Sequence, residues 1–471
     1  MKCRPAFKQT RTWQRASSLV MSQLLCMGRH TVTGLLCTAG RQFHDWSADY
    51  RLFSKCRFDQ DALFGVIRKG VLDEISPHQP LVVAIDDSIM RKTGRRTPGV
   101  AWRRDPLGPP FHVNFINAQR ILQISAAVPK NPPGPGPARM IPVDFIHAPT
   151  PKRPRKTAAP SLWEEYRQKK QEHNISLKGA HRLQHLRNEL DNNDNQSQRP
   201  LWALADGRFA NRNFLKNLPE RTTVIVRARA DAKLYHPPAP KPTRSAGRKR
   251  LYGEREKTPE EILKDQSIPY QRAEAFAAGK LHQFKVKTLA PLLWRTAGAQ
   301  TPLRLIVIAP LGYRLRKKGR LLYRKPAYLL CTDPALSLEQ IIQAYVWRWD
   351  IEVNFRDEKQ LVGVGEAQVR SKASVQNAPA LAVAAYAMLL LAAHQAFGYD
   401  TVPHVIPPPK WRTASPKPRA STLDLIRHLR AELWGAALDK HNFNGFMNSM
   451  TEDLKPEKLK PQLHSAVLYA A

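Results

Sequence analysis

Cysteine is scarce in this chain. Among 471 residues there are five, and none forms a Cys-x-x-Cys pair: they stand at positions 3, 26, 37, 56 and 331. This spacing excludes a zinc ribbon and a disulfide framework. The longest apolar run, residues 378–393, contains Pro379 and is shorter than the roughly 18–20 residues of a membrane span, and residues 1–25 lack a signal-peptide core. We therefore expect a cytoplasmic protein with no membrane segment, and we interpret the run as a buried helix.

Acidic residues are also few. The chain has 39 Asp and Glu against 75 Lys and Arg, for a formal net charge of +36. Such a charge indicates a polyanionic partner, by default nucleic acid, although a merely solvated basic surface is the alternative. No G-x-x-x-x-G-K-[ST] motif is present, so we expect no ATP-driven chemistry. The hydrophobic share of 42% excludes global disorder, and the length suits two or three domains.

The first 75 residues are predicted to be helical. Apolar residues recur at helical spacing from Arg11 to Leu36, and this pattern is interrupted at Met27-Gly28-Arg29, which is typical of a helix-turn-helix. A further helix is predicted over Asp59–Ile75. We assign a small helical DNA-binding domain to residues 1–78. A plain helical cap on the next domain is the alternative.

Continuous apolar runs predict buried strands at Leu81–Ile85 and Leu201–Ala205, and each run ends in aspartate. Further expected elements are a hairpin of Phe111–Asn117 with Arg120–Val128, a helix over Ser161–Leu190 and a strand over Thr222–Arg227. Together they predict the first part of an α/β catalytic core, residues 79–228.

The second half of the chain is predicted to interrupt and then complete this core. Strands expected at 281–289, 303–310 and 327–332 indicate a β-rich insertion over 229–336. This insertion includes a Pro-rich basic loop, residues 236–260, that we expect to face DNA. A long helix at about 338–361, which starts with a capping box at Ser337, and the apolar helix complete the core over 337–400. A basic tail follows over 401–471.

Three carboxylates follow from this order of elements. Two acids that end neighbouring strands lie side by side, and a glutamate on a helix packed across the sheet can join them. Carboxylates without a His or Cys cluster suit Mg²⁺ or Mn²⁺, and two such ions activate a water or 3′-hydroxyl against a phosphodiester. The alternative is ordinary: Asp86-Asp87 only end a strand, and Asp206-Gly207 is a common turn dipeptide.

The long helix carries the candidate glutamate. At ~100° per residue, its members Tyr345, Arg348, Glu352 and Lys359 fall within an arc of about 60°. Glu352 could hold a metal while Arg348 and Lys359 bind phosphates. A surface salt-bridge cluster on an amphipathic helix is the alternative.

This spacing, Tyr345-x2-Arg348-x3-Glu352-x6-Lys359, resembles the Y-x2-R-x3-E-x6-K signature of bacterial insertion-sequence transposases with a DDE triad. Asp86-Asp87-Ser88, followed by Lys92-Thr93-Gly94, is similar to the D-D-T…K-x-G segment of the same superfamily. Residues 204–209 and 227–232 resemble its second-Asp strand and the R-x-R-x-D-A that follows. The resemblance covers about residues 80–400.

The resemblance implies a ribonuclease-H-like catalytic core with a β-rich insertion and Mg²⁺-dependent (or Mn²⁺-dependent) chemistry. It implies that Asp206 and Glu352 are metal ligands and that Tyr345, Arg348 and Lys359 bind the DNA backbone near the scissile phosphate. For the first ligand, neighbouring strand residues face opposite ways, so only one of Asp86 and Asp87 serves. The commoner Asp-x-Thr/Ser pattern favours Asp86 with Ser88, and Asp87 is the alternative.

The expected activity is transposition. The resemblance implies binding of double-stranded DNA at the terminal inverted repeats of an insertion sequence, cleavage there and strand transfer to target DNA. It implies a homodimer, because both ends must be paired, in a nucleoid-associated enzyme. Two alternatives are a catalytically idle DNA-binding repressor derived from a transposase and a nuclease that cuts without joining.

Overall fold

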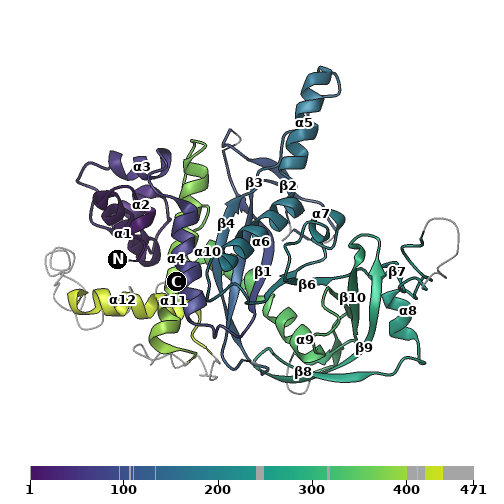
Figure 1. Cartoon of the computed structure of the whole chain (residues 1–471). Helices are drawn as coiled ribbons and strands as arrows, with labels where there is room; N and C mark the ends of the chain where they lie inside the picture. The colour runs from purple at the N-terminus through teal and green to yellow at the C-terminus, as the bar shows by residue number, and fades with distance from the viewer. Residues whose placement is uncertain are drawn as a thin grey trace. The chain divides into compact units, whose positions relative to one another are not determined.

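The computed structural model describes residues 2–94, 96–105, 108–109, 111–132, 134–239, 249–315, 319–399, 411 and 419–438 (Figure 1). The chain forms two compact units, Arg68–Phe355 and Met1–Ile67 together with Arg356–Ala471. The limits between them fall inside helices α4 (Gln60–Asp73) and α10 (Asp350–Gln360). The finer division predicted above, at 78, 228, 336 and 400, stays a prediction.

The larger unit is built on one mixed sheet. Eleven of the described strands join it, in the order β2-β3-β1-β5-β6-β13-β10-β9-β7, with β4 paired to β3 and β8 to β9. The strands are β1 (Leu81–Arg91), β2 (Ala101–Arg104), β3 (Phe115–Pro129), β4 (Ala138–His147), β5 (Leu201–Ala205), β6 (Thr222–Arg227), β7 (Leu234–Tyr235), β8 (Gln271–Ala277), β9 (Lys280–Trp294), β10 (Gly298–Ile308) and β13 (Ala327–Cys331). A separate pair, β11 (Gly312–Tyr313) with β12 (Leu322–Tyr323), lies outside it.

The centre of the sheet confirms the predicted buried strands. β1 runs parallel to β5, and β5 runs parallel to β6. Val83, Ala84 and Ile85 follow one another without solvent exposure, which is the pattern of a strand in the middle of a sheet. The result is a mixed α/β fold with a large mixed sheet, consistent with a ribonuclease-H-like core.

The predicted hairpin of Phe111–Asn117 with Arg120–Val128 is wrong. Residues of both segments belong to one strand, β3, whose middle residues Ala118 and Gln119 are buried and pair with β1. Ala118 also pairs with Ala101 of β2. Because backbone groups on both sides of this stretch have strand partners, no turn forms there. The hairpin that exists joins β3 to β4.

The strands expected between residues 281 and 332 are present, but they continue the central sheet. β13 pairs antiparallel with β6, so that Leu330 lies opposite Val226, and β10 and β9 follow outward from it. Part of the basic loop, residues 240–248, lies outside the described residues. The loop's far end returns to the sheet through a bridge between Tyr235 and Arg255, before helix α8 (Pro259–Lys264).

The predicted long helix over 338–361 is two helices, α9 (Leu338–Trp347) and α10 (Asp350–Gln360). The capping box at its start is confirmed, since Ser337 and Gln340 exchange side-chain to backbone hydrogen bonds. Between the helices, the amide of Trp349 donates to the carbonyl of Val346 at 3.2 Å, an i→i−3 bond that tightens the turn. Trp349, which stands at this turn, is 61% exposed.

The other helices of the larger unit lie between β4 and β6 in the chain. The helix expected over Ser161–Leu190 is divided into α5 (Pro160–Glu172) and α6 (Ile175–Asp191), with a short α7 (Arg212–Leu215) further on. Asn174 causes the division, because its side chain accepts hydrogen bonds from the amides of Ser176 and Leu177 and so starts a new helix.

The other unit is helical. Its N-terminal part holds α1 (Thr10–Leu25), α2 (Val32–Thr38) and α3 (Ser47–Ser54), and its later part α11 (Ser374–Phe397) and α12 (Thr422–Leu438). Thr31 caps α2 by accepting from the amide of Gly34, so two helices do flank the predicted turn. α11 meets the length and composition of a membrane span, with a hydropathy of 1.7, but 56% of that window is buried, and α1 and α3 pack against it.

Candidate metal-binding carboxylate site

Asp86 and Asp206 lie at the same level of neighbouring strands. In the parallel pairing of β1 with β5, Ile85 lies opposite Ala205, and each aspartate is the next residue. The prediction that the first strand ends at Asp86-Asp87 is wrong, because β3 goes on pairing with β1 as far as Arg91. Asp86 therefore sits within a strand at the point where its other neighbour, β5, has ended.

The environment of Asp86 disfavours a bare negative charge. Its side chain is 16% exposed. Burial raises the pKa of Asp86 to about 7, and the charges of Asp206 and then Asp87 act in the same direction. Crowded carboxylates of this kind are stabilised by a cation.

Asp87 lies on the other face of β1, as strand alternation requires. Its side chain is 3% exposed and forms an ion pair with Arg208, whose Nη1 donates to both carboxylate oxygens at 2.5 and 2.7 Å. Burial lowers the pKa of Arg103 and of Arg120, and the negative charge of Asp87 opposes this shift in both residues. Asp87 is thus surrounded by cations of the chain itself, whereas Asp86 faces Asp206 and Arg348.

Arg348 connects the sheet to the helical glutamate. Its Nη1 lies 4.0 Å from Asp86 Oδ2, and its Nη2 donates to Glu352 Oε1 at 3.1 Å. The side chain of Arg348 is only 10% exposed. Two of its nitrogens, Nε and Nη1, are buried with no hydrogen-bond partner in the described part of the chain.

Tyr345 belongs to the same group of side chains. Its ring centre lies 5.4 Å from the guanidinium carbon of Arg348. Burial raises the pKa of Tyr345, with Arg348 opposing this shift and Asp206 adding to it. The structure therefore brings together five predicted site residues of the larger unit: Tyr345, Arg348, Asp86, Asp206 and Glu352.

Lys359, like Asp87, is a predicted site residue whose placement differs. It lies about two turns beyond Glu352 on α10, past the limit of the larger unit. Burial lowers the pKa of Lys359, and Glu358 opposes that shift. Its role at the phosphate stays a prediction.

Sequence reasoning missed two residues that shape the site. Arg208 neutralises Asp87, and its position two residues after Asp206 was the available signal. Asn354 is buried, and its amide nitrogen donates to the carbonyl of Met140 on β4 at 3.1 Å, so it fixes the first part of α10 against the sheet. An asparagine inside an amphipathic helix gave no such indication, because its partner is 214 residues away.

Carboxylates from two parallel strands, gathered with a helical glutamate in a mixed α/β fold, define a class of proteins whose oxygen-rich site suits a hard divalent cation. The sequence model of the DDE superfamily endonucleases matches residues 4–291, more than half of the chain, and the chain belongs to this family. A comparison with curated proteins gave no match.

The family accounts for the coarse features of the site. Membership places the chain among enzymes of the nuclease and transposase type and implies DNA as the substrate. Members of the family normally use a divalent metal. The matched residues include both aspartates but end before α9. The signature around Glu352 therefore lies beyond the match.

Proposed function

We propose that this protein is a DNA transposase that binds the terminal inverted repeats of an insertion sequence and catalyses cleavage and strand transfer. The observation that carries the proposal is the shared contact of Arg348 with Asp86 and Glu352, next to the strand end that bears Asp206, in a chain of the DDE family. The proposal includes a homodimer on double-stranded DNA at the nucleoid, because two ends have to be cut and joined together.

Asp86, Asp206 and Glu352 would hold Mg²⁺ or Mn²⁺. The donor set fits, since all of its atoms are carboxylate oxygens, which hard ions prefer. Burial, and after it the negative charges of Asp206 and Asp87, raise the pKa of Asp86, and a bound cation would offset both effects. When bound, such ions activate the attacking water or 3′-hydroxyl and stabilise the leaving oxygen. No nearby residue of the chain other than Arg348 offers Asp86 an ion pair among the described residues.

Asp86, rather than Asp87, is the first ligand in this proposal. Asp87 already accepts two short hydrogen bonds from Arg208. To bind a metal, the buried carboxylate of Asp87 would have to give up these hydrogen bonds. Ser88 follows Asp86 by two residues and thus shares its face of β1. This arrangement agrees with the Asp-x-Ser pattern.

Arg348 and Tyr345 would bind the scissile phosphate. The unpartnered Nε and Nη1 of Arg348 are buried next to the carboxylates, and guanidinium groups bind phosphate through paired hydrogen bonds. The ring of Tyr345 holds the guanidinium from one side at 5.4 Å and restricts its orientation. Lys359 would add a further contact to the DNA backbone.

The test is a Glu352→Gln variant, which keeps the shape and an acceptor for Arg348 but removes a ligand charge. We expect DNA affinity within about twofold of the unaltered chain and a loss of Mg²⁺-dependent cleavage of at least ~10³-fold. Cleavage and joining are measured on labelled DNA from the ends that flank the coding region. Glu339→Gln, at an exposed position of α9, is the matched control.

The unaltered chain separates the competing functions in the same assay. Cutting with joining supports a transposase, cutting alone a nuclease, and binding without cutting the idle repressor. Full cleavage by Glu352→Gln would remove Glu352 from the site and with it the three-carboxylate proposal.

A further inference from the structure

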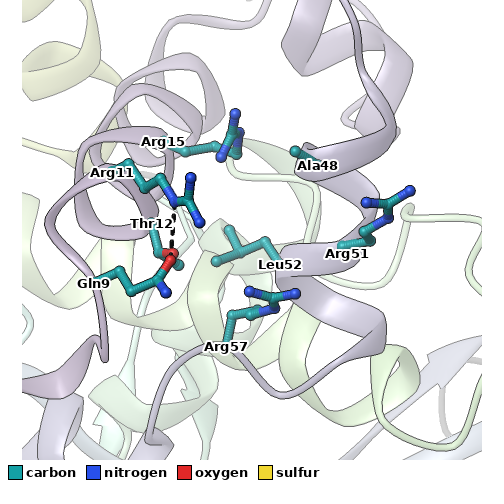
Figure 2. A pocket seen from close by; sticks show the side chains of 8 residues that line it. All are labelled: Gln9, Arg11, Thr12, Arg15, Ala48, Arg51, Leu52 and Arg57. Carbon is teal, nitrogen blue, oxygen red and sulfur yellow. Dashed lines mark hydrogen bonds between the residues drawn. The ribbon is translucent and has the colours of Figure 1, made fainter.

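The helical unit has a pocket lined by arginine. It encloses about 230 Å³ between α1, α3 and the residues after α3, and its lining includes Arg11, Arg15, Arg51 and Arg57. Figure 2 shows these four side chains arranged around Leu52. Leu52 is buried, as is Thr12 beside Arg11.

The sequence places these arginines together through two helices. Arg11 and Arg15 are four residues apart on α1 and so share one face of it. Arg51 is in the last turn of α3, and Arg57 follows shortly after that helix ends. α1 and α3 pack against each other, which brings the two pairs to one opening.

The lining contains no acidic residue to neutralise these charges. Asp49, which is fully buried, lies 3.1 Å from Arg15 and also 3.2 Å from Arg41, so its single charge is shared by two cations. Hydrogen bonds from Ser47 lower the pKa of the exposed Asp45, and the positive charge of Arg51 adds to this shift. Positive charge therefore exceeds negative charge at this opening.

Three of the four arginines, Arg11, Arg51 and Arg57, have donors available to a ligand, and Arg51 makes no ion pair or side-chain hydrogen bond with a described residue. Arg11 Nε donates to the side-chain oxygen of Gln9 at 2.9 Å, a neutral partner that orients the guanidinium (Figure 2). The guanidinium of Arg57 makes no ion pair or side-chain hydrogen bond with any residue that the structure describes. Converging guanidinium groups with free donors are suited to phosphate, which accepts several hydrogen bonds at once.

We propose that this pocket binds a backbone phosphate of double-stranded DNA, as a second contact separate from the carboxylate site. DNA is favoured over a free anion because Arg11 and Arg51 are exposed and can reach a phosphate on a continuous surface, and because the whole chain carries a net charge of +36. The inference rests on the proposed function only in taking duplex DNA as the polyanion.

The test compares the double variant Arg11→Gln/Arg57→Gln with Lys55→Gln. Lys55 is exposed, lies between Arg51 and Arg57 in the sequence and does not line the pocket. Binding to a fluorescein-labelled duplex of about 30 base pairs is measured by anisotropy at several salt concentrations, without divalent cation so that no cleavage occurs. Thermal melting checks that each variant is folded.

We expect the double variant to lose affinity on the order of tenfold or more, and its salt dependence to be shallower by roughly one unit of log K per log salt. Lys55→Gln should change affinity by less than about twofold. Arg57→Lys, which keeps the charge but not the planar fork, should fall between the unaltered chain and Arg57→Gln.

Three results with the variants would overturn the inference. Equal losses in Lys55→Gln and the double variant would indicate general charge, and an unchanged affinity of the folded double variant would exclude the pocket. Calorimetric binding of inorganic phosphate that the double variant loses, without a change in duplex affinity, would assign the pocket to a free anion. The proposed cleavage is judged separately by Glu352→Gln, but an unaltered chain that binds no duplex would overturn both.

Discussion

Asp86 and Asp87 are neighbours in the sequence but have opposite surroundings. Strand alternation sends one toward Asp206 and Arg348 and the other toward Arg208. The alternation itself could be predicted from the sequence. Alternation does not say which aspartate faces Asp206, because that depends on the partners that β5 and the loop after it supply; only the resemblance, through its Asp-x-Thr/Ser pattern, favoured Asp86.

The two aspartates are therefore expected to respond differently to replacement by asparagine. Asp86→Asn should lower the rate of Mg²⁺-dependent cleavage by at least ~10³-fold, since it removes the charge of a proposed metal ligand. Asp87→Asn should keep cleavage within about tenfold and lower the free energy of unfolding by roughly 1–3 kcal/mol, because the hydrogen bonds from Arg208 are weakened.

End-labelled DNA cleavage and urea denaturation, run on both variants, measure these effects. The reverse order, with Asp87→Asn inactive and Asp86→Asn active, would make Asp87 the first ligand.

At the scale of elements, a buried lysine ties α8 to the central sheet. Lys287 on β9 is 2% exposed, and its Nζ donates to the carbonyls of Ile262, Leu263 and Asp265 at 3.1, 3.1 and 2.5 Å. It also lies 4.6 Å from the ring centre of Tyr270. The last carbonyls of a helix have no partner within it, so Lys287 acts as their cap.

We expect Lys287→Met to lower the free energy of unfolding by about 2–4 kcal/mol, because three carbonyls lose a charged donor. Lys285→Met, at an exposed position two residues earlier on β9, should change it by less than about 0.5 kcal/mol. Urea denaturation of both variants measures the difference. Similar values for the two variants would show that the cap contributes little.

The division of the predicted long helix is also decided at this scale. The helical spacing of apolar residues continues from Ser337 to Gln360, and the sequence has no Gly or Pro between these two residues. The tightened turn at Trp349 places Tyr345 on α9 and Glu352 on α10, with Arg348 between them. Their meeting at Arg348 depends on how both helices pack, which spacing alone does not specify.

At the scale of the whole molecule, the net charge of +36 should make DNA binding strongly dependent on salt. Neutralised phosphates release counterions, so we expect the affinity of the unaltered chain to fall by roughly 10³-fold or more between about 50 and 200 mM salt. Anisotropy with a labelled duplex measures the slope. A nearly flat response would contradict the role assigned to the basic surface.

The sequence alone determined the features that depend on neighbouring residues. The strand Leu201–Ala205 occurs where a continuous apolar run predicted it, and the strand Thr222–Arg227 where β-branched residues predicted it. The capping box at Ser337 forms because its hydrogen bonds span three residues. Tertiary packing decided the rest: that β3 is one strand, that Asp86 faces Asp206 while Asp87 faces Arg208, and that arginines of α1, of α3 and of the residues after α3 share one pocket. These features join residues far apart in the chain, whose distances are set only when the sheet and the helices close around a common core.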